Sequence, residues 1–455
     1  MVPIQENAMT AQLKRNFVEM NSRMTKNEAL EEANRCLYCY DAPCIKACPT
    51  SIPIPNFIKK IASANMKGSA KTIMEANPIG ASCARVCPTE ELCEGACVLN
   101  DSTKPIKIGH LQRYATDWAM DTGVELFKQG QSNGLKVAIV GSGPAGLSAA
   151  RELSRFGYSV TIFEAEAKAG GLGNYGIVSF RLPNDVVDWE VEQVVKLGVD
   201  IKTNTTVGVD ISADEIIAQY DSVILAVGMG AVPNLGIEGE ELAGVHDAIE
   251  FVKQTKIGTL TEDIVGKRVA VIGAGNTAID GATCAVRLGA EQVEILYRRT
   301  EKEMTAYKFE YEFAKQDGVV FKWLTAPKRI IGDESGKVVG LECVKMRLGE
   351  ASADGRQRPE EIKGSEFIIE LDAVIKAIGQ TRFVQLIEAF GLQHTNGVVD
   401  IDETTMQTSN KKVFACGDVV FGNGQGEAMV VTAAQQGKDA AYIIHERLRK
   451  PSEIV

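Results

Sequence analysis

The stretch that decides the fold is Lys136-Val-Ala-Ile-Val-Gly-Ser-Gly-Pro-Ala-Gly146. Its first half is apolar, which predicts a buried strand over Val137–Val140. Three glycines follow with the spacing G-x-G-x-x-G. They permit a tight turn, a close approach of the backbone to a pyrophosphate, and close packing of the next helix. The free N–H groups at the start of that helix favour a negatively charged group. The stretch therefore predicts a dinucleotide site at the end of a strand.

An acidic residue in the expected place supports this prediction. A second strand is predicted over Ser159–Phe163, and Glu164 follows it directly. An acid at this point of a dinucleotide-binding unit binds ribose hydroxyls. A lone glycine triplet could be a mere turn, but the strand, the helix and the acid together favour a dinucleotide with an unmodified ribose.

A second copy of the same device lies downstream, at Arg268-Val-Ala-Val-Ile-Gly-Ala-Gly-Asn-Thr-Ala278. Alanine replaces the third glycine. No acid ends the next predicted strand, Gln292–Tyr297, and Arg298 and Arg299 stand there instead. Two guanidinium groups fit a 2′-phosphate through charge and bidentate hydrogen bonds. A solvated arginine pair on a loop is the alternative, and we favour NADPH over NADH.

The repeat extends further along the chain. Asp221-Ser-Val-Ile-Leu-Ala-Val-Gly228 is echoed by Asp372-Ala-Val-Ile-Lys-Ala-Ile-Gly379. Helical patterns alternate with short β-branched strands, as a parallel sheet requires. The sequence therefore predicts two dinucleotide-binding α/β domains after a linker at Gly130–Gly134.

The N-terminal 130 residues have a mostly helical pattern and a concentration of cysteine. Thr25 and Glu28 form a capping-box pattern that opens a helix, and Pro55 starts a helix expected to run through Asn65. Of the 11 cysteines in the 455 residues, all but three lie between Cys36 and Cys97.

These cysteines read as a metal-binding cluster. A disulfide scaffold would need a secreted context, and the first thirty residues lack the unbroken apolar run of an export signal. We therefore expect a cytoplasmic protein. Close thiols followed by a more distant Cys-Pro resemble the bacterial ferredoxin pattern. Zinc is the alternative, because Cys-x2-Cys also begins zinc ribbons. Iron–sulfur clusters are favoured.

Charge and hydropathy exclude other classes. The net charge of −11 argues against a nucleic-acid binder, which normally presents a basic surface. No stretch approaches the apolar length of a membrane helix. We expect neither nucleic acid nor a membrane as a partner.

A chemical argument joins the parts. NADPH delivers a hydride, which carries two electrons, whereas iron–sulfur clusters accept one electron at a time. A flavin can do both, so FAD belongs between them. The cofactors carry the reaction, and no side chain is required as a general acid.

The region from Lys136 onward resembles the two-dinucleotide-binding flavoproteins that include the glutathione and thioredoxin reductases. Val413-Phe-Ala-Cys-Gly-Asp418 carries this resemblance together with the two glycine turns. The resemblance implies FAD at the first turn and NAD(P)H at the second. The expected FAD residues are Gly141, Ser142, Gly143, Pro144, Ala145, Gly146, Glu164, Gly171, Leu172, Arg181, Gly417 and Asp418. The expected NADP residues are Gly273, Ala274, Gly275, Asn276, Thr277, Ala278, Arg298, Arg299, Ala377 and Gly379.

One feature of those reductases is missing. They keep a redox-active cysteine pair beside the flavin, whereas Cys284 and Cys343 are far apart in this sequence and Cys416 reads as a small buried residue. The flavin's electrons must leave by another route.

The whole chain resembles the electron-input half of dihydropyrimidine dehydrogenase and the corresponding separate bacterial subunit, within the glutamate synthase small-subunit-like flavoproteins. The motifs are Cys36-Leu-Tyr-Cys-Tyr-Asp-Ala-Pro-Cys-Ile-Lys-Ala-Cys-Pro-Thr50, Ser82-Cys-Ala-Arg-Val-Cys-Pro-Thr-Glu-Glu-Leu-Cys93, Ile108-Gly-His-Leu-Gln112 and Phe180-Arg-Leu-Pro183. The resemblance implies two [4Fe-4S] clusters. The first would be held by Cys36, Cys39, Cys44 and Cys97, and the second by Cys48, Cys87, Cys93 and Gln112.

This ligand set leaves Cys83 out. The residues alone suggest eight cysteines for two four-ligand clusters, and Gln112 as an exposed helix residue. Whether Gln112 or Cys83 completes the second cluster is therefore open.

The expected fold class is α/β, with an α-helical double iron–sulfur domain before two Rossmann-like domains, the second inserted in the first. The expected domains are residues 1–130 for the clusters, 131–262 plus 380–455 for FAD, and 263–379 for NAD(P)H.

The expected function is electron transfer from NADPH through FAD and two clusters to a partner that reduces uracil or thymine to dihydropyrimidines. Nothing in the chain offers a second flavin site, so we expect a separate FMN/iron–sulfur catalytic subunit as the partner. Thr305 stands where the pyrimidine enzyme has a further basic residue, so NADH is also possible.

Three alternatives remain. The small subunit of glutamate synthase is similar, but its second cysteine group is typically more compact than Cys87-x5-Cys93. The large subunit of ferredoxin-dependent NADPH transhydrogenase is also similar, typically with an acid where Gln112 stands. A zinc-stapled, non-enzymatic nucleotide sensor belongs to a different class.

Overall fold

The computed structural model describes residues 15–258, 264, 266–351, 357–422 and 428–449. These residues form two compact units. The inserted unit contains the described residues of 1–20, 175–180 and 230–381, and the main unit contains those of 21–174, 181–229 and 382–455. The chain leaves the main unit and returns to it, which confirms the predicted insertion of one nucleotide-binding fold into the other.

Five parallel strands form the sheet of the main unit, in the order β16-β4-β1-β2-β3. Buried apolar runs such as β4 are typical of parallel strands, which are covered on both faces. The strands are β1 (Lys136–Val140), β2 (Ser159–Phe163), β3 (Asp200–Lys202), β4 (Ser222–Leu225) and β16 (Val413–Ala415).

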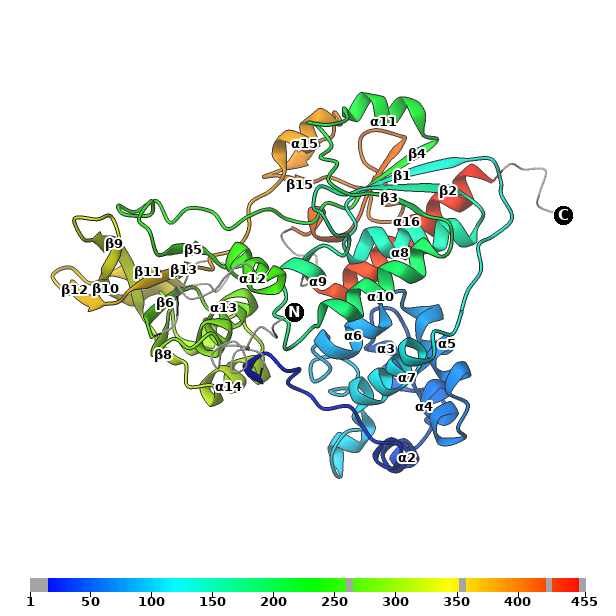
Figure 1. Ribbon diagram of the computed structural model, residues 1–455, viewed down its shortest axis with the longest axis horizontal. Helices are drawn as coiled ribbons and strands as arrows, with labels where there is room; N and C mark the ends of the chain where they lie inside the picture. Colours follow the sequence, from blue (N-terminus) through cyan, green and yellow to red (C-terminus); the bar gives the residue numbers. More distant parts are fainter. Residues whose placement is uncertain (1–14, 259–263, 265, 352–356, 423–427, 450–455) are drawn as a thin grey trace, which may run out of the picture. The chain divides into compact units, whose positions relative to one another are not determined.

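Two long helices lie side by side against this sheet, α8 (Pro144–Arg155) and α16 (Val430–Leu448) (Figure 1). They approach closely because Gly437 has no side chain: a Cβ there would lie 2.0 Å from the carbonyl oxygen of Ala145. The sequence pattern predicts that this last helix starts at about Glu427, a residue that lies outside the described ranges. The other elements of this part are α9 (Leu172–Tyr175), which ends in the inserted unit, α10 (Asn184–Val195), α11 (Ala213–Gln219), α15 (Val384–Ala389), β14 (His394–Thr395), β15 (Val398–Val399) and the 3-10 helix η3 (Gly417–Val419).

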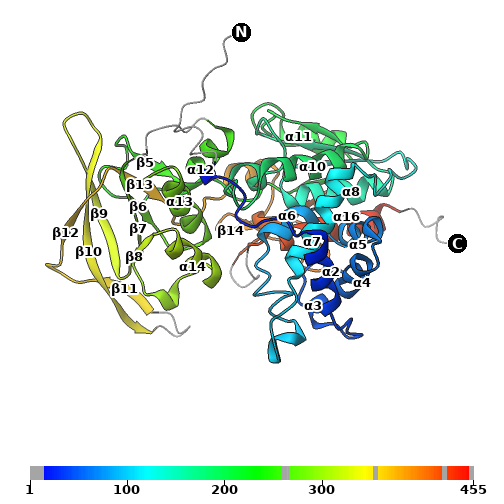
Figure 2. The same ribbon diagram turned by 60° about the horizontal axis from the view of Figure 1, so that its bottom comes forward.

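The cysteine-rich part of the main unit is helical, and Figure 2 shows its helices gathered together. Phe57, Ile61, Ile73 and Leu111 form its core, and Cys48 and Cys93 join them. The helices are α2 (Lys26–Arg35), α3 (Pro43–Lys46), α4 (Ile54–Ala62), α5 (Met66–Ala76), α6 (Gly80–Val86), α7 (Ile108–Thr122) and the 3-10 helix η1 (Val98–Asp101).

Local signals explain where two of these helices start and stop. The capping box of Thr25 and Glu28 is present at the start of α2. Helix α4 ends at Ala62 and not at the predicted Asn65, because Ala64 adopts a left-handed backbone (φ +59°). Asn65 instead caps α5, accepting a hydrogen bond from the backbone N–H of Gly68.

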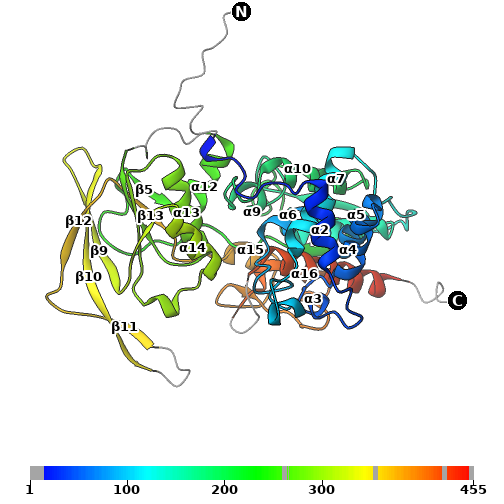
Figure 3. The same cartoon turned by 90° about the horizontal axis from the view of Figure 1, so that it is seen from below.

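The inserted unit repeats the parallel sheet, in the order β5-β13-β6-β7-β8. Its strands are β5 (Val245–Asp247), β6 (Arg268–Ile272), β7 (Gln292–Leu296), β8 (Val320–Lys322) and β13 (Ala373–Lys376). Its helices are α12 (Ala248–Ile257), α13 (Asn276–Arg287), α14 (Lys308–Gln316) and the 3-10 helix η2 (Glu301–Glu303). Antiparallel strands extend from it (Figure 3): β9 (Thr325–Gly332), β10 (Val338–Ala351), β11 (Gln357–Glu361) and β12 (Phe367–Glu370).

The sequence repeat coincides with a structural repeat. Strands β1 and β6 are central in their sheets, and β4 and β13 lie beside them. Each predicted glycine turn therefore joins the central strand of a parallel sheet to a helix.

The unit boundaries differ from the predicted domain limits. The inserted unit begins at Gly230, whereas the sequence suggested a domain start at residue 263. Strand β5 pairs with β13, and the Asp247 carboxylate caps α12 and accepts from the backbone N–H of Val232 at 2.6 Å. Residues 15–20 also belong to this unit, where Asn16 and Arg287 exchange two hydrogen bonds at 2.8 Å.

Charged side chains fix the cysteine-bearing helices to the sheet part within the main unit. The Arg151 guanidinium, buried on α8, donates to the carbonyl oxygens of Met74 and Glu75 at the end of α5. The Lys438 ammonium on α16 donates to the carbonyl of Ala76. Cations at a helix C-terminus satisfy its free carbonyl groups and oppose the helix dipole.

At the start of the neighbouring helix α6, a carboxylate satisfies the free N–H groups of the backbone. Glu190 on α10 accepts from the backbone N–H groups of Ala81 (2.8 Å) and Ser82 (3.0 Å) and from the Ser82 hydroxyl. Burial raises the pKa of Glu190 to about 7 and outweighs these hydrogen bonds, which lower it. Both helix ends beside the turn at 77–79 are therefore held by the sheet part.

We expect Glu190 to make stability depend on pH. Its folded pKa lies above its ordinary value of 4.5, so its contribution is complete below pH 4.5 and is lost as the pH rises through about 7. One proton corresponds to a slope of at most about 1.4 kcal/mol per pH unit. Glu190→Gln keeps an acceptor for the two N–H groups and should reduce the slope by that amount. The measurement is the melting temperature of the holoprotein at pH 5, 6 and 7.

Glu192→Gln is the matched control, because Glu192 is exposed on the same helix and pairs only with Lys196 among the described residues. An equal pH slope in wild type and Glu190→Gln would contradict the assignment.

None of the helices in the described part of the chain combines the length and the apolar character needed to cross a bilayer.

Candidate functional site

The first glycine turn is closed on the protein side and open on the other. A Cβ on Gly141 would lie 2.5 Å from the carbonyl oxygen of Ala226, and one on Gly146 would lie 2.0 Å from the carbonyl oxygen of Gly141. Gly141 also has φ +98°, which favours glycine. Nothing lies within 4 Å of a Cβ built on Gly143. The open side, at the N-terminus of α8, leaves room for a pyrophosphate.

The Glu164 carboxylate lies at the base of this turn. One oxygen accepts from the backbone N–H (3.0 Å) and the hydroxyl (2.5 Å) of Ser142, and the other accepts from the N–H of Glu166 (2.8 Å). The Ser142 hydroxyl in turn accepts from the N–H of Gly170 at 3.0 Å. A buried carboxylate here repels a phosphate on a ribose, which fits the predicted unmodified ribose.

Two other predicted FAD residues, Gly171 and Gly417, approach the same turn. A Cβ on Gly171 would lie 2.8 Å from Cα of Gly143, and one on Gly417 would lie 3.0 Å from Cβ of Ala145. The N–H of Gly417 donates to the side-chain oxygen of Gln436 on α16 at 2.7 Å. Burial raises the pKa of the Asp418 carboxyl, and the Arg382 charge opposes this shift. Pro144 and Ala145 open α8, Leu172 opens α9, and Arg181 is a partly buried residue of the same unit.

The second glycine turn has the same geometry in the inserted unit. Gly273 has φ +126°, and a Cβ there would lie 2.2 Å from the carbonyl oxygen of Ala377 on the neighbouring strand end. Ala278 is fully buried in α13, where the third glycine of the pattern would stand. Gly379 has φ +106° and open space around it. Thr277 follows Asn276 in the first turn of α13.

A segment that the motif does not include packs against this turn. The N–H groups of Thr305 and Ala306 donate to the carbonyl of Ala274 at 3.3 and 3.1 Å, and that of Tyr307 donates to the Asn276 side chain at 3.3 Å. The Thr305 hydroxyl lies 3.2 Å from a Cβ built on Gly275. Sequence reasoning noted Thr305 only as a departure from a family pattern and missed its contact with the turn.

The predicted phosphate-binding arginines follow β7. Arg298 is exposed and Arg299 is partly buried. The Nε of Arg299 is buried and has no hydrogen-bond partner among the described residues. Hydrogen bonding from Thr300 lowers the pKa of Glu303, and the Arg299 charge adds to this effect. An unsatisfied guanidinium N–H is available to donate a hydrogen bond to an anionic ligand.

The cysteines separate into two groups by their electrostatic interactions. The first contains Cys36, Cys39, Cys44 and Cys97. Burial raises the pKa of Cys44 to about 11, and the charges of the other three members raise it further. Burial also raises the pKa of Cys36, and Cys39 and Cys97 contribute. This group coincides with the first predicted ligand set.

The second group contains Cys48, Cys83, Cys87 and Cys93. A hydrogen bond with Cys83 raises the pKa of Cys87, followed by burial and the charges of Cys83, Cys93 and Cys48. Burial raises the pKa of Cys93, and the charges of Glu94, Cys48 and Cys44 contribute, so the two groups interact with each other through Cys44. The structure thus brings Cys83 among the predicted ligands of the second cluster.

Gln112 is not the exposed helix residue that the residues alone suggested. Its side chain is 6% exposed, and its amide nitrogen donates to the carbonyl of Gly80 at 2.7 Å. The packing of α7 against α6 buries this face, which a single-helix pattern does not reveal. Since the amide nitrogen of Gln112 already donates to Gly80, the amide oxygen is the side-chain atom that can coordinate a metal.

The donor chemistry suits iron–sulfur clusters. Among the described residues, no three His, Cys, Asp or Glu side chains converge as ligands of a single metal ion. Thiols that raise one another's pKa repel as thiolates, and a cationic iron core relieves that repulsion.

The second cysteine group lies against the sheet part. Cys83 packs with Ile79, Val431 and Ala434, and Cys87 lies at the edge of the same cluster. Val431 and Ala434 belong to α16, the helix that carries Gln436 beneath Gly417. Cys48 and Cys93 pack among the cysteine-rich helices, in the same cluster as Cys36, Cys44 and Cys97 of the first group. Through Cys83 and Cys87 alone, the second group reaches nearer to the first glycine turn.

Comparison with known proteins covers both parts of the chain. Residues 13–124 match the family described as dihydropyrimidine dehydrogenase domain II, 4Fe-4S cluster, and residues 135–437 match pyridine nucleotide-disulphide oxidoreductases. The glutamate synthase [NADPH] small chain of Escherichia coli K12 is 37% identical over 440 residues, which cover 93% of this chain and 92% of that protein. The NAD-dependent dihydropyrimidine dehydrogenase subunit PreT of Salmonella typhimurium is 35% identical over 433 residues (95% and 97%).

A longer relative matches only in part. The NADP(+)-dependent formate dehydrogenase subunit beta of Moorella thermoacetica is 36% identical over 433 residues, and this chain spans 60% of its length. Among solved structures, Mycobacterium tuberculosis FprA in complex with NADPH has a TM-score of 0.57 at 20% identity, covering 69% of this chain and 84% of that one. The thioredoxin reductase of T. acidophilum has a TM-score of 0.54 at 22% identity, covering 69% of this chain and 98% of that one.

The likeness to the solved structures concerns the fold, whereas the family match spans both glycine turns and the two near-full-length relatives also span the cysteines. The chain belongs to the pyridine nucleotide-disulphide oxidoreductase family, and it is a flavin- and iron–sulfur-containing NAD(P)H oxidoreductase.

Proposed function

We propose that this chain is the electron-input subunit of a two-subunit dihydropyrimidine dehydrogenase. It takes electrons from NADPH and passes them through FAD and two [4Fe-4S] clusters to a separate FMN/iron–sulfur subunit that reduces uracil or thymine. The observation that carries the proposal is the packing of Cys83 and Cys87 on α16, the helix whose Gln436 holds Gly417 beside the first glycine turn. The similarity to PreT along almost its whole length supports the choice of partner reaction.

The residues around each turn have distinct tasks in this proposal. The N–H groups at the start of α8 bind the FAD pyrophosphate, and Glu164 selects an unphosphorylated ribose. At the second turn, Arg298 and Arg299 bind the 2′-phosphate of NADPH. A bound flavin accepts a hydride and releases its electrons singly.

The cysteine groups define a direction for the electrons. The second group would hold the cluster nearer to the flavin, because its members Cys83 and Cys87 pack on α16. The first group would hold the outer cluster. The side chains of Leu37 and Tyr40 are exposed. Leu37 lies between Cys36 and Cys39 in the sequence and Tyr40 follows Cys39, so a partner subunit can approach the outer cluster there.

The fourth ligand of the second cluster can be tested directly. If Gln112 ligates through its amide oxygen, Gln112→Ala should remove about half of the iron and acid-labile sulfide from anaerobically prepared protein. Cys83→Ala, which removes the nearest non-ligand sulfur, should leave the iron content unchanged. Gln112→Glu keeps an oxygen ligand but adds a negative charge, so it should retain iron and lower the reduction potential. Loss of iron in Cys83→Ala with retention in Gln112→Ala would assign the ligand to Cys83.

The preference for NADPH over NADH needs a test of its own, because one near-full-length relative is named for NADPH and the other for NAD. Replacing both Arg298 and Arg299 with Ala should lower kcat/KM for NADPH by about 100-fold or more, since each charge-assisted hydrogen bond contributes about 1.5–3 kcal/mol. The kcat/KM for NADH should stay the same. The assay is dye reduction by the holoprotein. Lys302→Ala, an exposed cation of the same loop, is the control, and an unchanged NADPH/NADH ratio would remove the arginines from the site.

The partner assignment needs the complex. The isolated holoprotein should reduce artificial dyes with NADPH and leave uracil and thymine unchanged, whereas the complex co-purified from the native host should form dihydropyrimidines. Reduction of uracil by the isolated chain would refute the two-subunit proposal.

A second candidate function is the small chain of a glutamate synthase, favoured by the 37% identity over 92% of the Escherichia coli protein. A co-purified complex that forms glutamate with NADPH and leaves pyrimidines unchanged would establish this candidate and overturn the first.

A further inference from the structure

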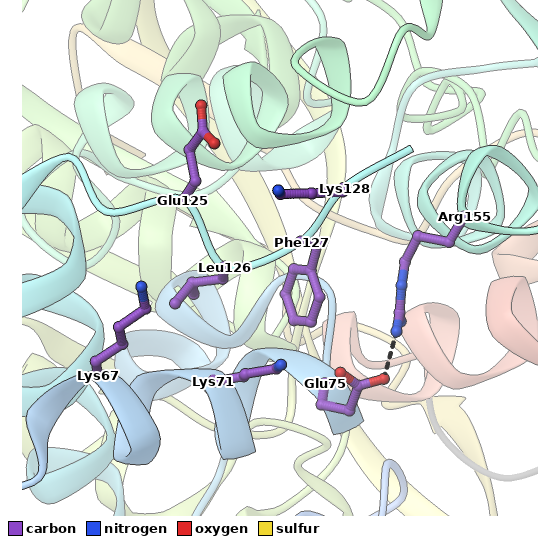
Figure 4. Close-up of a pocket in the computed structure, with 8 residues that line it drawn as sticks. All are labelled: Lys67, Lys71, Glu75, Glu125, Leu126, Phe127, Lys128 and Arg155. Carbon is purple, nitrogen blue, oxygen red and sulfur yellow. Dashed lines mark hydrogen bonds and ion pairs between the residues drawn. The ribbon is translucent and has the colours of Figure 1, made fainter. Parts of the chain in front are cut away.

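A hollow of about 600 Å³ opens in the main unit, away from both cysteine groups and from the glycine turn. Figure 4 shows the side chains around it. They come from α5, from the segment that connects α7 to β1, and from the end of α8. The lining residues are Lys67, Lys71, Glu75, Glu125, Leu126, Phe127, Lys128 and Arg155. Its volume lies in the range of small-ligand pockets.

The lining is basic although the chain as a whole carries a net charge of −11. Four cations face two carboxylates. One of these carboxylates, Glu75, is already paired with Arg155 at 2.6 Å, and Arg155 also pairs with Glu152. Three ammonium groups and the single carboxylate of Glu125 remain, so the hollow keeps an excess of positive charge.

The three lysines have no ion pair or hydrogen bond from their side chains within the described residues. Lys67 and Lys71 stand four residues apart on α5, so they project from one face of the helix, and Lys128 lies across the hollow (Figure 4). Like charges held around one space repel one another. An anion between them removes this repulsion and receives several hydrogen bonds.

The floor of the hollow is fixed. Leu126 packs in a buried cluster with Met74 and Ala119. The ring of Phe127 lies near two guanidinium groups, those of Arg151 at 5.0 Å and Arg155 at 4.7 Å from its centre. Because these cations already engage the ring, recognition would depend on the lysines and not on stacking of a base on Phe127.

We propose that this hollow binds a small polyanion of the polyphosphate class, a chain of two or three linked phosphate groups, through Lys67, Lys71 and Lys128. Linked phosphates match the arrangement because three separated ammonium groups require several anionic oxygens. A single carboxylate or monophosphate offers these groups fewer anionic oxygens and less negative charge than linked phosphates do. An inorganic polyphosphate and a nucleoside triphosphate both carry such a group, and both present the same chemistry to the lysines.

Occupancy has a structural consequence. Glu75 and Arg155 line the hollow, and the carbonyl of Glu75 also accepts from Arg151 in the joint between the cysteine helices and the sheet part. A bound polyanion would therefore stabilise that joint in the folded protein and raise its melting temperature.

The test is calorimetric titration of the FAD-loaded holoprotein, saturated with NADP⁺ to fill the second glycine turn, at about 0.15 M salt. Tripolyphosphate should bind saturably, and orthophosphate and AMP should bind at least tenfold more weakly. ATP that binds as tightly as tripolyphosphate identifies the phosphate chain as the determinant, and tighter binding of ATP identifies a nucleotide as the source.

Lys67→Gln, Lys71→Gln and Lys128→Gln should each weaken tripolyphosphate about tenfold, in keeping with about 1.4 kcal/mol for each charge-assisted contact. They should leave kcat and KM for NADPH-driven dye reduction unchanged. Lys411→Gln, an exposed lysine of the same unit outside the hollow, is the control. Absence of saturable binding, or unchanged affinity in the triple variant, would overturn the proposal. Neither result bears on the electron-input function.

Discussion

Three charged side chains hold the cysteine-rich helices on the sheet of the main unit. Arg151 and Lys438 satisfy the carbonyl groups at the end of α5, and Glu190 satisfies the N–H groups at the start of α6. Helix ends buried without partners would each leave several polar groups unsatisfied, so these contacts are a condition for packing the two parts together. The α6 helix carries Cys83 and leads to Cys87, and α8 and α10 flank the first glycine turn. The placement of sulfur donors beside a nucleotide site therefore depends on buried charge as well as on apolar contact.

The two glycine turns show how one backbone design is adapted to different ligands. Both turns close on a carbonyl of the neighbouring strand end, Ala226 in one case and Ala377 in the other. The difference lies in the charge at the next strand end, a buried carboxylate at Glu164 and a partly buried guanidinium at Arg299. The geometry leaves room for a pyrophosphate at both turns, and in the proposed assignment the charge at the next strand end selects the ribose that each site accepts.

Helices and strands were predicted well from the sequence where a short local pattern specifies them. The buried runs at β1 and β2 and the capping box at α2 are found at the predicted residues or one residue away. The sequence predicted element ends and unit boundaries less well where tertiary packing determines them. The left-handed Ala64 ends α4 early, and the three-residue strand β5 moves the start of the inserted unit to Gly230, although neither has a pattern of its own.

The same limit applies to the sites. The predicted glycines and the first cysteine set come together as the motifs imply. The burial of Gln112, the nearness of Cys83 to the second set and the contact of Thr305 with the second turn all arise from helices or loops that meet only in the folded chain. The hollow beside Phe127 likewise combines three segments whose lysines look like ordinary surface residues in the sequence.

The insertion of one unit between β4 and β16 sets an order for biosynthesis. Strand β16 and helix α16 emerge from the ribosome after the whole of the inserted unit, yet β16 pairs with β4, and α16 packs on α8. The inserted unit can complete its sheet first, while the nascent main unit still exposes one edge and one face. Such long-range closure is slow and leaves apolar surface open to aggregation. The exposed face therefore needs protection until α16 has emerged and packed on α8, and only then is the packing around Cys83 complete.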